Sequence, residues 1–347
     1  MRSISDSYSY FASANSFEGF KSNFAKIFAP EEYERIYIIK GGPGTGKSSL
    51  MKRISENLRC KDVTLTKFLC SSDPKSLDAI ILSRSNKKIA FIDGTAPHTT
   101  EAKYIGAVER IINLADSLDI SKLKTRKEEI ISISNSKSMA YKNAYLYLNT
   151  CEKVHDYIMS ELCNIDINSE AEEICDRILT FEMFAKVNEK TEVDCWVSAF
   201  CKDGYVRLNI PCVEKEYISI KGDGFTEQVI MKRLRDTLAS YSCIQRVATS
   251  PLTSNAIDLI ITNSAIISTD NVGSTLIDTS MLARHMDKEY KETLDIYTRM
   301  LKLSQDCFMK ASKFHFELEE IYSSNIDFAL HDLLINDLTE EIGNLLL

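Results

Sequence analysis

Eight consecutive residues have the types and spacing needed to bind a phosphate chain. They read Gly41-Gly42-Pro43-Gly44-Thr45-Gly46-Lys47-Ser48 and fit the pattern G-x-x-x-x-G-K-[ST]. Glycines let the backbone turn successive N–H groups inward, which makes a nest for phosphate oxygens. We expect the Lys47 ammonium to face solvent in the free protein and to contact the β- and γ-phosphates of a bound nucleotide. The Ser48 hydroxyl suits Mg²⁺, a hard cation that prefers oxygen ligands.

The surroundings of this loop support the same interpretation. An apolar strand, Ile36–Ile39, is predicted to enter the loop, and a helix, Ser48–Leu58, is predicted to leave it. The positive end of that helix would point at the phosphates, and Ser49 in its first turn completes the predicted nucleotide-binding segment. An N-K-x-D segment, which guanine recognition usually needs, does not occur, so the sequence favours Mg-ATP as the ligand.

A carboxylate follows the next apolar run. Asp93 ends the predicted strand Lys88–Asp93, where it fits the second residue on the Mg²⁺ side of P-loop NTPases. The alternative is an ordinary aspartate at a strand end before the turn at Gly94. We therefore predict Lys47 and Asp93 as catalytic residues, and Ser48 and Asp93 as metal ligands. Many fast hydrolases carry a glutamate where Gly94 stands, so the base remains unassigned, with His98 and Glu101 as candidates.

A second polar segment is expected at the same edge of the sheet. Cys70-Ser71-Ser72-Asp73-Pro74 follows the predicted strand Val63–Cys70. Ligands bind at the carboxyl ends of strands in open α/β sheets, so Ser71, Ser72 or Asp73 could contact a substrate or the γ-phosphate. The alternative is a turn and helix N-cap before a helix over Ser76–Leu82.

The chain contains four pairs of similar segments in the same order. The ten residues from Phe11 resemble the ten from Trp196, and Ile36–Ile54 resembles Tyr217–Leu234, which shares Lys-Gly and a closing Met-Lys-Arg. Ile89–Thr95 resembles Ile266–Val272, and Lys153-Val154-His155 resembles Lys313-Phe314-His315. The offset falls steadily from about 185 to about 160 residues, which favours an internal duplication with deletions in the second copy.

These patterns predict an α/β protein of two P-loop NTPase-like halves, each a three-layer unit with a parallel sheet and a helical insertion or extension. The first half would be residues 1–190, with a helical hairpin over about 121–187, and the second 191–347, with C-terminal helices over about 283–347. Apolar residues at three-to-four spacing predict an amphipathic helix from Ala140 to Leu162, another through Ile174, Ile178 and Phe181, and a third from Tyr290 to Leu318.

The second copy of the loop lacks the residues that bind phosphate. When Met231 is set on Met51, Glu227 stands where Lys47 does and Gln228 where Ser48 does. A carboxylate there would repel phosphate, so this half is predicted to be a structural or regulatory partner. An arginine reaching from it to the first loop is conceivable; the candidates are Arg233, Arg235 and Arg246.

Composition limits the setting and the partners. The net charge of −8 does not indicate nucleic acid as a partner. No run reaches the roughly 18 apolar residues of a membrane span, and the segment before Phe17 lacks the apolar core of a secretion signal. The ten cysteines form no C-x-x-C pair and are expected to be reduced and mostly buried, in a cytoplasmic protein.

The order of these motifs resembles a family of tandem P-loop bacterial proteins usually described only as ATPases or as uncharacterised. The motifs are FASANSFEGF, KGGPGTGKSS, FLCSSDPKSLDAIIL, FIDGTAPH, KYIGAVERIINLAD and HFELEEIYSSNIDF. The resemblance spans nearly the whole chain and implies ATP over GTP, two P-loop-like halves, phosphate binding by Gly41–Ser48 and an acidic strand end at Asp93. This chain departs from the family in its second loop, GDGFTEQ.

Three functions remain open at this stage. The first is an ATPase whose nucleotide state controls the arrangement of the two halves or a protein partner. The second is a phosphotransferase acting on a small molecule bound under the segment Ser71–Pro74. The third is a nucleotide-stabilised scaffold with little turnover.

Overall fold

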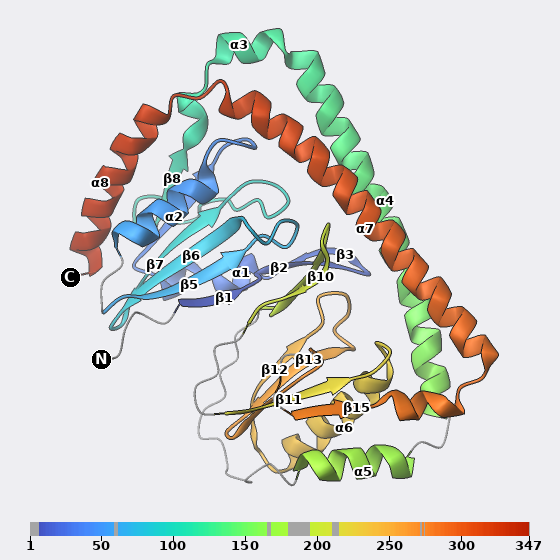
Figure 1. Ribbon diagram of the computed structural model, residues 1–347. Coiled ribbons are helices and arrows are strands. Elements are labelled where there is room, and N and C mark those ends of the chain that lie inside the picture. The colour runs from blue at the N-terminus through green and yellow to red at the C-terminus, as the bar shows by residue number, and fades with distance from the viewer. Residues whose placement is uncertain are drawn as a thin grey trace.

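The structure, a computed structural model, describes residues 7–58, 62–164, 168–179, 195–209, 215–270, 273 and 275–346. It contains two mixed β-sheets, each packed against helices, and a pair of long helices that runs past both (Figure 1). The first sheet has helices on both of its faces, although the helix on one face is short. The boundary predicted near residue 190 lies outside the described residues.

The first sheet has the strand order β1-β5-β6-β7-β4-β8. The neighbours of β4 run parallel to it, as predicted, but β6 is antiparallel to both β5 and β7. The prediction of a parallel sheet is therefore wrong at β6. The bounds are β1 Ser7–Tyr10, β4 Arg35–Lys40, β5 Thr64–Leu69, β6 Leu77–Arg84, β7 Lys87–Asp93 and β8 Glu109–Asn113.

The antiparallel strand β6 replaces the helix considered over Ser76–Leu82. Its apolar run is short and carries isoleucines at adjacent positions, Ile80 and Ile81, which suit a pleated strand buried in the centre of a sheet. A short apolar run does not by itself distinguish such a strand from a buried helix. The turn at Pro74 joins β5 and β6 as a hairpin.

The second sheet repeats five strands of the first in order and direction. Its order is β12-β13-β14-β11-β15, with β13 antiparallel to its neighbours and β11 parallel to both of its own. This matches β5-β6-β7-β4-β8 strand for strand. The bounds are β11 Glu216–Lys221, β12 Ile244–Thr249, β13 Ile257–Thr262, β14 Ala265–Ser268 and β15 Thr275–Asp278.

Two short hairpins lie between the sheets and correspond to the first pair of similar segments (Figure 1). Just before each hairpin begins, the two segments contact each other: Phe11 and Trp196 exchange two backbone hydrogen bonds, each 2.9 Å long. These two residues occupy equivalent positions in the similar segments, so the contact is self-complementary, as at a two-fold axis. The strands are β2 Ser13–Ser16, β3 Gly19–Ser22, β9 Ser198–Cys201 and β10 Gly204–Arg207.

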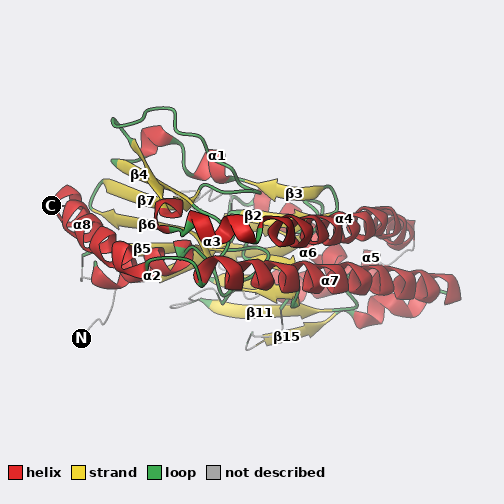
Figure 2. Cartoon of the chain, turned by 90° about the horizontal axis from the view of Figure 1, so that it is seen from above, coloured by secondary structure: helices red, strands yellow, loops and turns green. Residues whose placement is uncertain are grey.

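The long helices α4 (Lys127–Asn164) and α7 (Lys288–Ser323) form an antiparallel pair, which Figure 2 shows from above. The hydroxyl of Ser304 donates to the Ala144 carbonyl near the middle of the pair, while Tyr157 donates to Glu289 at one end. Both helices were predicted from their apolar spacing. Short elements precede or join the larger ones: α1 Phe24–Ile27, α3 Ile120–Thr125, η1 Pro30–Glu32, η2 Leu114–Ser117 and η3 Ser280–His285.

The last helix of each half crosses to the opposite sheet. Helix α5 (Asn168–Leu179) packs on α6 (Thr226–Ser240) in the core of the second sheet. Helix α8 (Phe328–Leu346) packs on α2 (Lys47–Asn57) in the core of the first. In the described part of the predicted hairpin over 121–187, α4 pairs with α7 of the other half, and residues 180–187 lie outside the described residues. The predicted C-terminal helices divide between the two halves.

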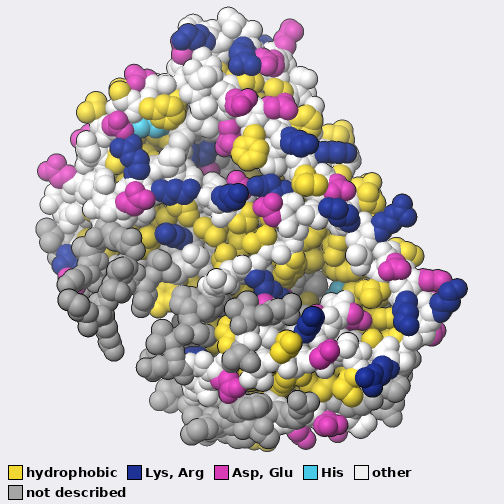
Figure 3. All heavy atoms as spheres, in the orientation of Figure 1, with side chains coloured by type: hydrophobic (Ala, Val, Ile, Leu, Met, Phe, Trp, Pro, Cys, Tyr) yellow, Lys and Arg dark blue, Asp and Glu magenta, His cyan; other side chains and the backbone are white. Residues whose placement is uncertain are grey.

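The surface, the helices and the cysteines add three plain observations. On the face shown in Figure 3, acidic and basic side chains are interspersed. No helix within the described ranges is long and apolar enough to cross a membrane. Seven cysteines whose side chains the structure describes are free thiols, and six of them are buried.

Candidate functional site

The segment Gly41–Ser48 joins β4 to α2, as the strand-loop-helix pattern predicted. Gly44 and Gly46 have φ of +68° and +83°, the left-handed region that glycine adopts without strain. The hydroxyl of the buried Thr45 donates to the Gly42 carbonyl at 2.8 Å and braces the turn. The loop thus has the backbone conformation on which an inward nest of N–H groups depends.

The Lys47 side chain folds back over its own loop. Its Nζ donates to the carbonyls of Gly41 and Gly42 at 3.0 and 2.9 Å, and lies 3.7 Å from Asp93 Oδ2. Because the side chain is only 13% exposed, the expectation that it faces solvent is wrong. The loop carbonyls and the carboxylate hold the ammonium beside the loop.

Ser48, Ser49 and Asp93 lie around the same strand ends. The Ser48 Oγ accepts the Leu77 N–H at 3.0 Å, which leaves a second lone pair on that oxygen, whereas Ser49 is exposed. Asp93 Oδ1 accepts from the backbone and hydroxyl of Thr95. Because β7 and β4 are parallel neighbours, the sheet brings together the three residues predicted to handle the γ-phosphate and the metal: Lys47, Ser48 and Asp93.

Asp78 joins this group, and sequence reasoning missed it. Ala79 pairs with Ile92 across β6 and β7, so Asp78 stands opposite Asp93 at the end of the sheet. Burial, opposed in part by His98, raises the pKa of Asp78 to about 6. The sequence does contain an indication of its role, because Asp78 is the one carboxylate in the apolar run Leu77–Leu82. Burying a charged carboxylate is unfavourable unless it has a partner or a function.

His98, one of the candidate bases, also reaches the group. Its Nε2 lies 3.6 Å from Asp78 Oδ2, and its ring stacks on Phe24 with centroids 4.6 Å apart. Lys40 fixes the segment leading to it by donating to the carbonyls of Gly94 and Thr100. The other candidate base, Glu101, is an exposed residue paired with Lys40.

Two helices from the other end of the chain touch the loop. A Cβ on Gly44 would lie 2.5 Å from the Glu319 carbonyl oxygen of α7, and one on Gly42 would lie 3.3 Å from the Tyr322 ring. Gly46 faces His331 of α8, whose Nε2 shares a hydrogen bond with Ser117. The loop is thus covered by the far end of α7, a contact that no local sequence pattern could indicate.

One further cation was missed by sequence reasoning. Lys137 on α4 interacts electrostatically with Lys47 and with Glu319, and burial followed by repulsion from Lys47 lowers its pKa. A lysine held close to another lysine against that repulsion is a natural partner for an anion between them.

The segment Ser71–Asp73 makes internal contacts in this structure. Ser71 is buried, with its hydroxyl 3.1 Å from that of Ser13, and its carbonyl accepts from Asn15. The Asp73 carboxylate accepts from Lys202 at 2.9 Å, which ties the first half to β9–β10. These contacts support the turn and inter-half packing more than a substrate site.

The second loop is filled by its own side chain. Glu227 Oε2 accepts the Gly224 N–H at 3.1 Å. Burial raises the pKa of Glu227, and hydrogen bonds from backbone N–H groups partly oppose this effect. Gln228 accepts the Ile257 N–H at 2.7 Å, as Ser48 accepts that of Leu77. This matching contact supports the predicted alignment of Gln228 with Ser48.

The register of β14 corrects another alignment by one residue. Ser219 and Ile38 are equivalent, because each is followed by one isoleucine and then by Lys-Gly. Ser219 pairs with Ser268, and Ile38 pairs with Ile92, so Ser268 is the counterpart of Ile92. The counterpart of Asp93 is therefore Thr269, and not Asp270. By the same register the counterpart of Asp78 is Asp258, since Leu259 pairs with Ser268.

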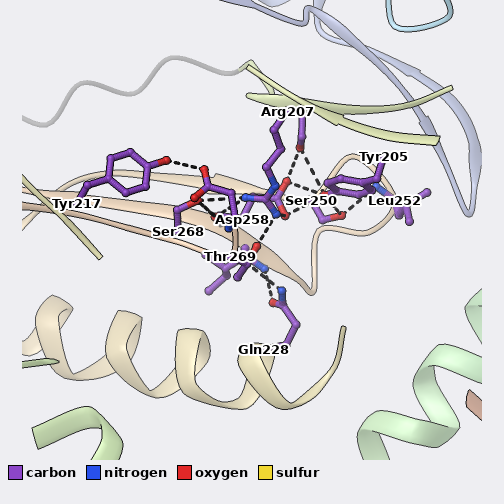
Figure 4. A network of polar contacts seen from close by, with 12 residues as sticks. Tyr205, Arg207, Tyr217, Gln228, Ser250, Leu252, Asp258, Ser268 and Thr269 are labelled. Atoms are coloured by element: carbon purple, nitrogen blue, oxygen red, sulfur yellow. Dashed lines mark hydrogen bonds and ion pairs between the residues drawn. The ribbon is translucent and has the colours of Figure 1, made fainter. Parts of the chain in front are cut away.

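Asp258 lies in a buried polar network, drawn in Figure 4. The Arg207 guanidinium from β10 donates to the Asp258 carboxylate at 3.1 Å, to Ser268, and to the Thr269 hydroxyl. The Tyr205 hydroxyl donates to the same carboxylate at 2.7 Å. In this half an internal cation therefore bridges the counterparts of Asp78 and Asp93.

The arginines considered as reaching the first loop lie elsewhere. Arg233 pairs with Glu172 of α5 at 3.8 Å, and Arg235 pairs with its neighbour Asp236. Arg246 donates to the Cys195 carbonyl and lies over the Tyr10 ring. All three have structural partners away from Gly41–Ser48.

No protein-family model, curated protein or solved structure matches the chain.

Proposed function

We propose that this protein binds Mg-ATP on Gly41–Ser49 and hydrolyses it, with the nucleotide state controlling how the two halves are arranged. The observation that carries this proposal is the convergence of Lys47, Ser48 and Asp93 around a loop whose glycines have positive φ. Lys47 and the loop N–H groups would hold the phosphates, while Ser48 and Asp93 would hold Mg²⁺, which neutralises charge developing on the transferred phosphoryl group.

Helix α7 supplies the mechanical link in this proposal. Its first turn contacts the second loop, where the Tyr290 hydroxyl donates to Asp223 at 2.6 Å. Its far end contacts the first loop through Glu319 and Tyr322. A helix of 36 residues is about 54 Å long, so a change at Gly44 would be transmitted to the other half by a rigid element.

We also propose that the halves arose by duplication and that the protein is related to tandem P-loop ATPases. The matching strand orders, the equivalent bonds of Ser48 and Gln228, and the self-complementary contact of Phe11 with Trp196 support this origin. Low turnover is the second candidate function, favoured by Gly94 at the position of the missing glutamate. Measuring phosphate release from Mg-ATP by the purified protein distinguishes it from an ATPase.

Mg-ATP is expected to raise the melting temperature and to bind once per chain. A ligand at a hundredfold its Kd adds about 2.7 kcal/mol to the free energy of unfolding, whereas GTP should add less. One site is expected because Glu227 places a carboxylate in the second loop. Thermal denaturation and isothermal titration measure both quantities. Equal stabilisation by GTP would contradict the adenine preference, and a stoichiometry near two would contradict the assignment of the second loop.

A further inference from the structure

Two buried polar atoms at the end of the first sheet lack hydrogen-bond partners among the described residues. They are Asp78 Oδ2 and His98 Nδ1, and their side chains are 7% and 5% exposed. Leaving a buried donor or acceptor unsatisfied is unfavourable, so such atoms in a folded protein call for a bound partner. Asp78 Oδ2 lies beside the other ring nitrogen of His98, Nε2, near Asp93, so these are the atoms that can share an ion. His98 Nδ1 is on a different edge of the ring and is not part of this group.

The spacing of these side chains suits a cation better than direct contacts. Asp78, Asp93 and His98 each offer a ligand atom, and these atoms lie within 4.8 Å of one another. The separation of 3.6 Å between Asp78 Oδ2 and His98 Nε2 is too long for a hydrogen bond. It is close to the separation of two atoms that each lie about 2.1 Å from one metal ion in tetrahedral geometry.

The second half holds a permanent cation at the equivalent place. There the Arg207 guanidinium bridges Asp258 and Thr269, the counterparts of Asp78 and Asp93. The counterpart of Arg207 on β3 is Ser22, because Ser22 pairs with Ser13 as Arg207 pairs with Ser198. Where the second half has Arg207, the first half has a serine. Beside Asp78 the first half instead has a second carboxylate, Asp93, and an imidazole, His98.

The two loops differ between the halves in a similar way. In the second loop the Glu227 carboxylate accepts a loop N–H, whereas the first loop has Lys47 at that position. The second half thus contains its own anion and its own cation, where the first half has groups suited to bind each from solution.

We propose that Asp78, Asp93 and His98 form a binding site for a divalent transition-metal ion. Two carboxylates and one imidazole suit Mn²⁺, Fe²⁺ or Zn²⁺, since imidazole is a poor ligand for Mg²⁺. The site shares Asp93 with the proposed nucleotide site, but its ligands come from β6, β7 and the segment after β7, so it binds its ion without nucleotide. It joins that segment to the sheet beside the phosphate loop.

The test uses Mn²⁺ alone, added to the full chain after chelator treatment and without nucleotide. Isothermal titration is expected to give one Mn²⁺ per chain, because Arg207 already fills the equivalent place in the second half. Asp78→Asn and His98→Ala are each expected to weaken Mn²⁺ binding at least tenfold. Zn²⁺ should compete for the site, and a tenfold excess of Mg²⁺ should not.

His315→Ala is the matched control, since His315 also lies near a carboxylate, Glu319, but on an exposed helix face. It should leave Mn²⁺ binding unchanged, and circular dichroism should show that every variant is folded. Absence of Mn²⁺ binding in the wild-type chain, or unchanged binding in Asp78→Asn or in folded His98→Ala, would overturn the proposal. ATP binding is titrated separately with Mg²⁺, so failure of the nucleotide site would be seen as a different result.

Discussion

Replacing Lys47 by alanine is expected to weaken Mg-ATP binding at least a hundredfold without unfolding the protein. In the proposed complex the ammonium is the one side-chain cation that Gly41–Ser48 supplies to the phosphates, and at about 4 Å a charge pair is worth about 4 kcal/mol at an effective dielectric of 20. Its contacts in the structure are with two loop carbonyls and Asp93. These carbonyls are half-buried, so water can replace the ammonium and the fold should survive.

Titration with a fluorescent ATP analogue measures this affinity. Lys291→Ala is a suitable control, because Lys291 is an exposed lysine on α7 away from the loop. Unchanged affinity in Lys47→Ala would show that Gly41–Ser48 does not bind the nucleotide, while a residual site of full strength would show that the second loop binds it instead.

Replacing Arg207 by leucine is expected to lower the free energy of unfolding by about 3–5 kcal/mol. The Asp258 side chain is only 2% exposed, and Arg207 is the cation paired with it. Removing the guanidinium leaves a carboxylate in a site that excludes water, which costs more than the pair contributes. Urea unfolding followed by circular dichroism measures the change.

Two further variants show whether the buried charge is responsible. Arg235→Leu should change stability by less than about 1 kcal/mol, since Arg235 is an exposed residue paired with an exposed aspartate. Adding Asp258→Asn to Arg207→Leu should recover part of the loss, because the uncompensated charge is then gone. A full loss that persists in the double variant would assign the effect to packing.

Local patterns predicted the parts of this protein that depend on nearby residues. The strand, loop and helix around Gly41–Ser48 could be predicted because an apolar run, glycines and a helical pattern follow one another directly between Arg35 and Asn57. Helices α4 and α7 could be predicted because their apolar stripes are long. Each of these features depends on residues that are close in sequence.

What the sequence did not indicate depends on distant contacts. The apolar run of β6 has no periodicity that separates a buried strand from a helix, so its direction and Asp78 were both missed. The crossing of α5 and α8 leaves no local mark, since an apolar helix face does not specify which sheet covers it. The one-residue error at Thr269 arose because an aspartate follows both strands at nearly the same place.

The crossing of α8 also sets an order of events during synthesis. Ile335, Leu338 and Ile342 complete the core that Leu50 and Ile54 begin, yet the ribosome makes the entire second half between them. Domains usually close one after another as they emerge, starting from the N-terminus. Here the first half must wait, with an apolar face of α2 uncovered, until residues 328–346 have emerged. This apolar face therefore stays exposed during most of translation, and exposed apolar surface makes a nascent chain prone to aggregation.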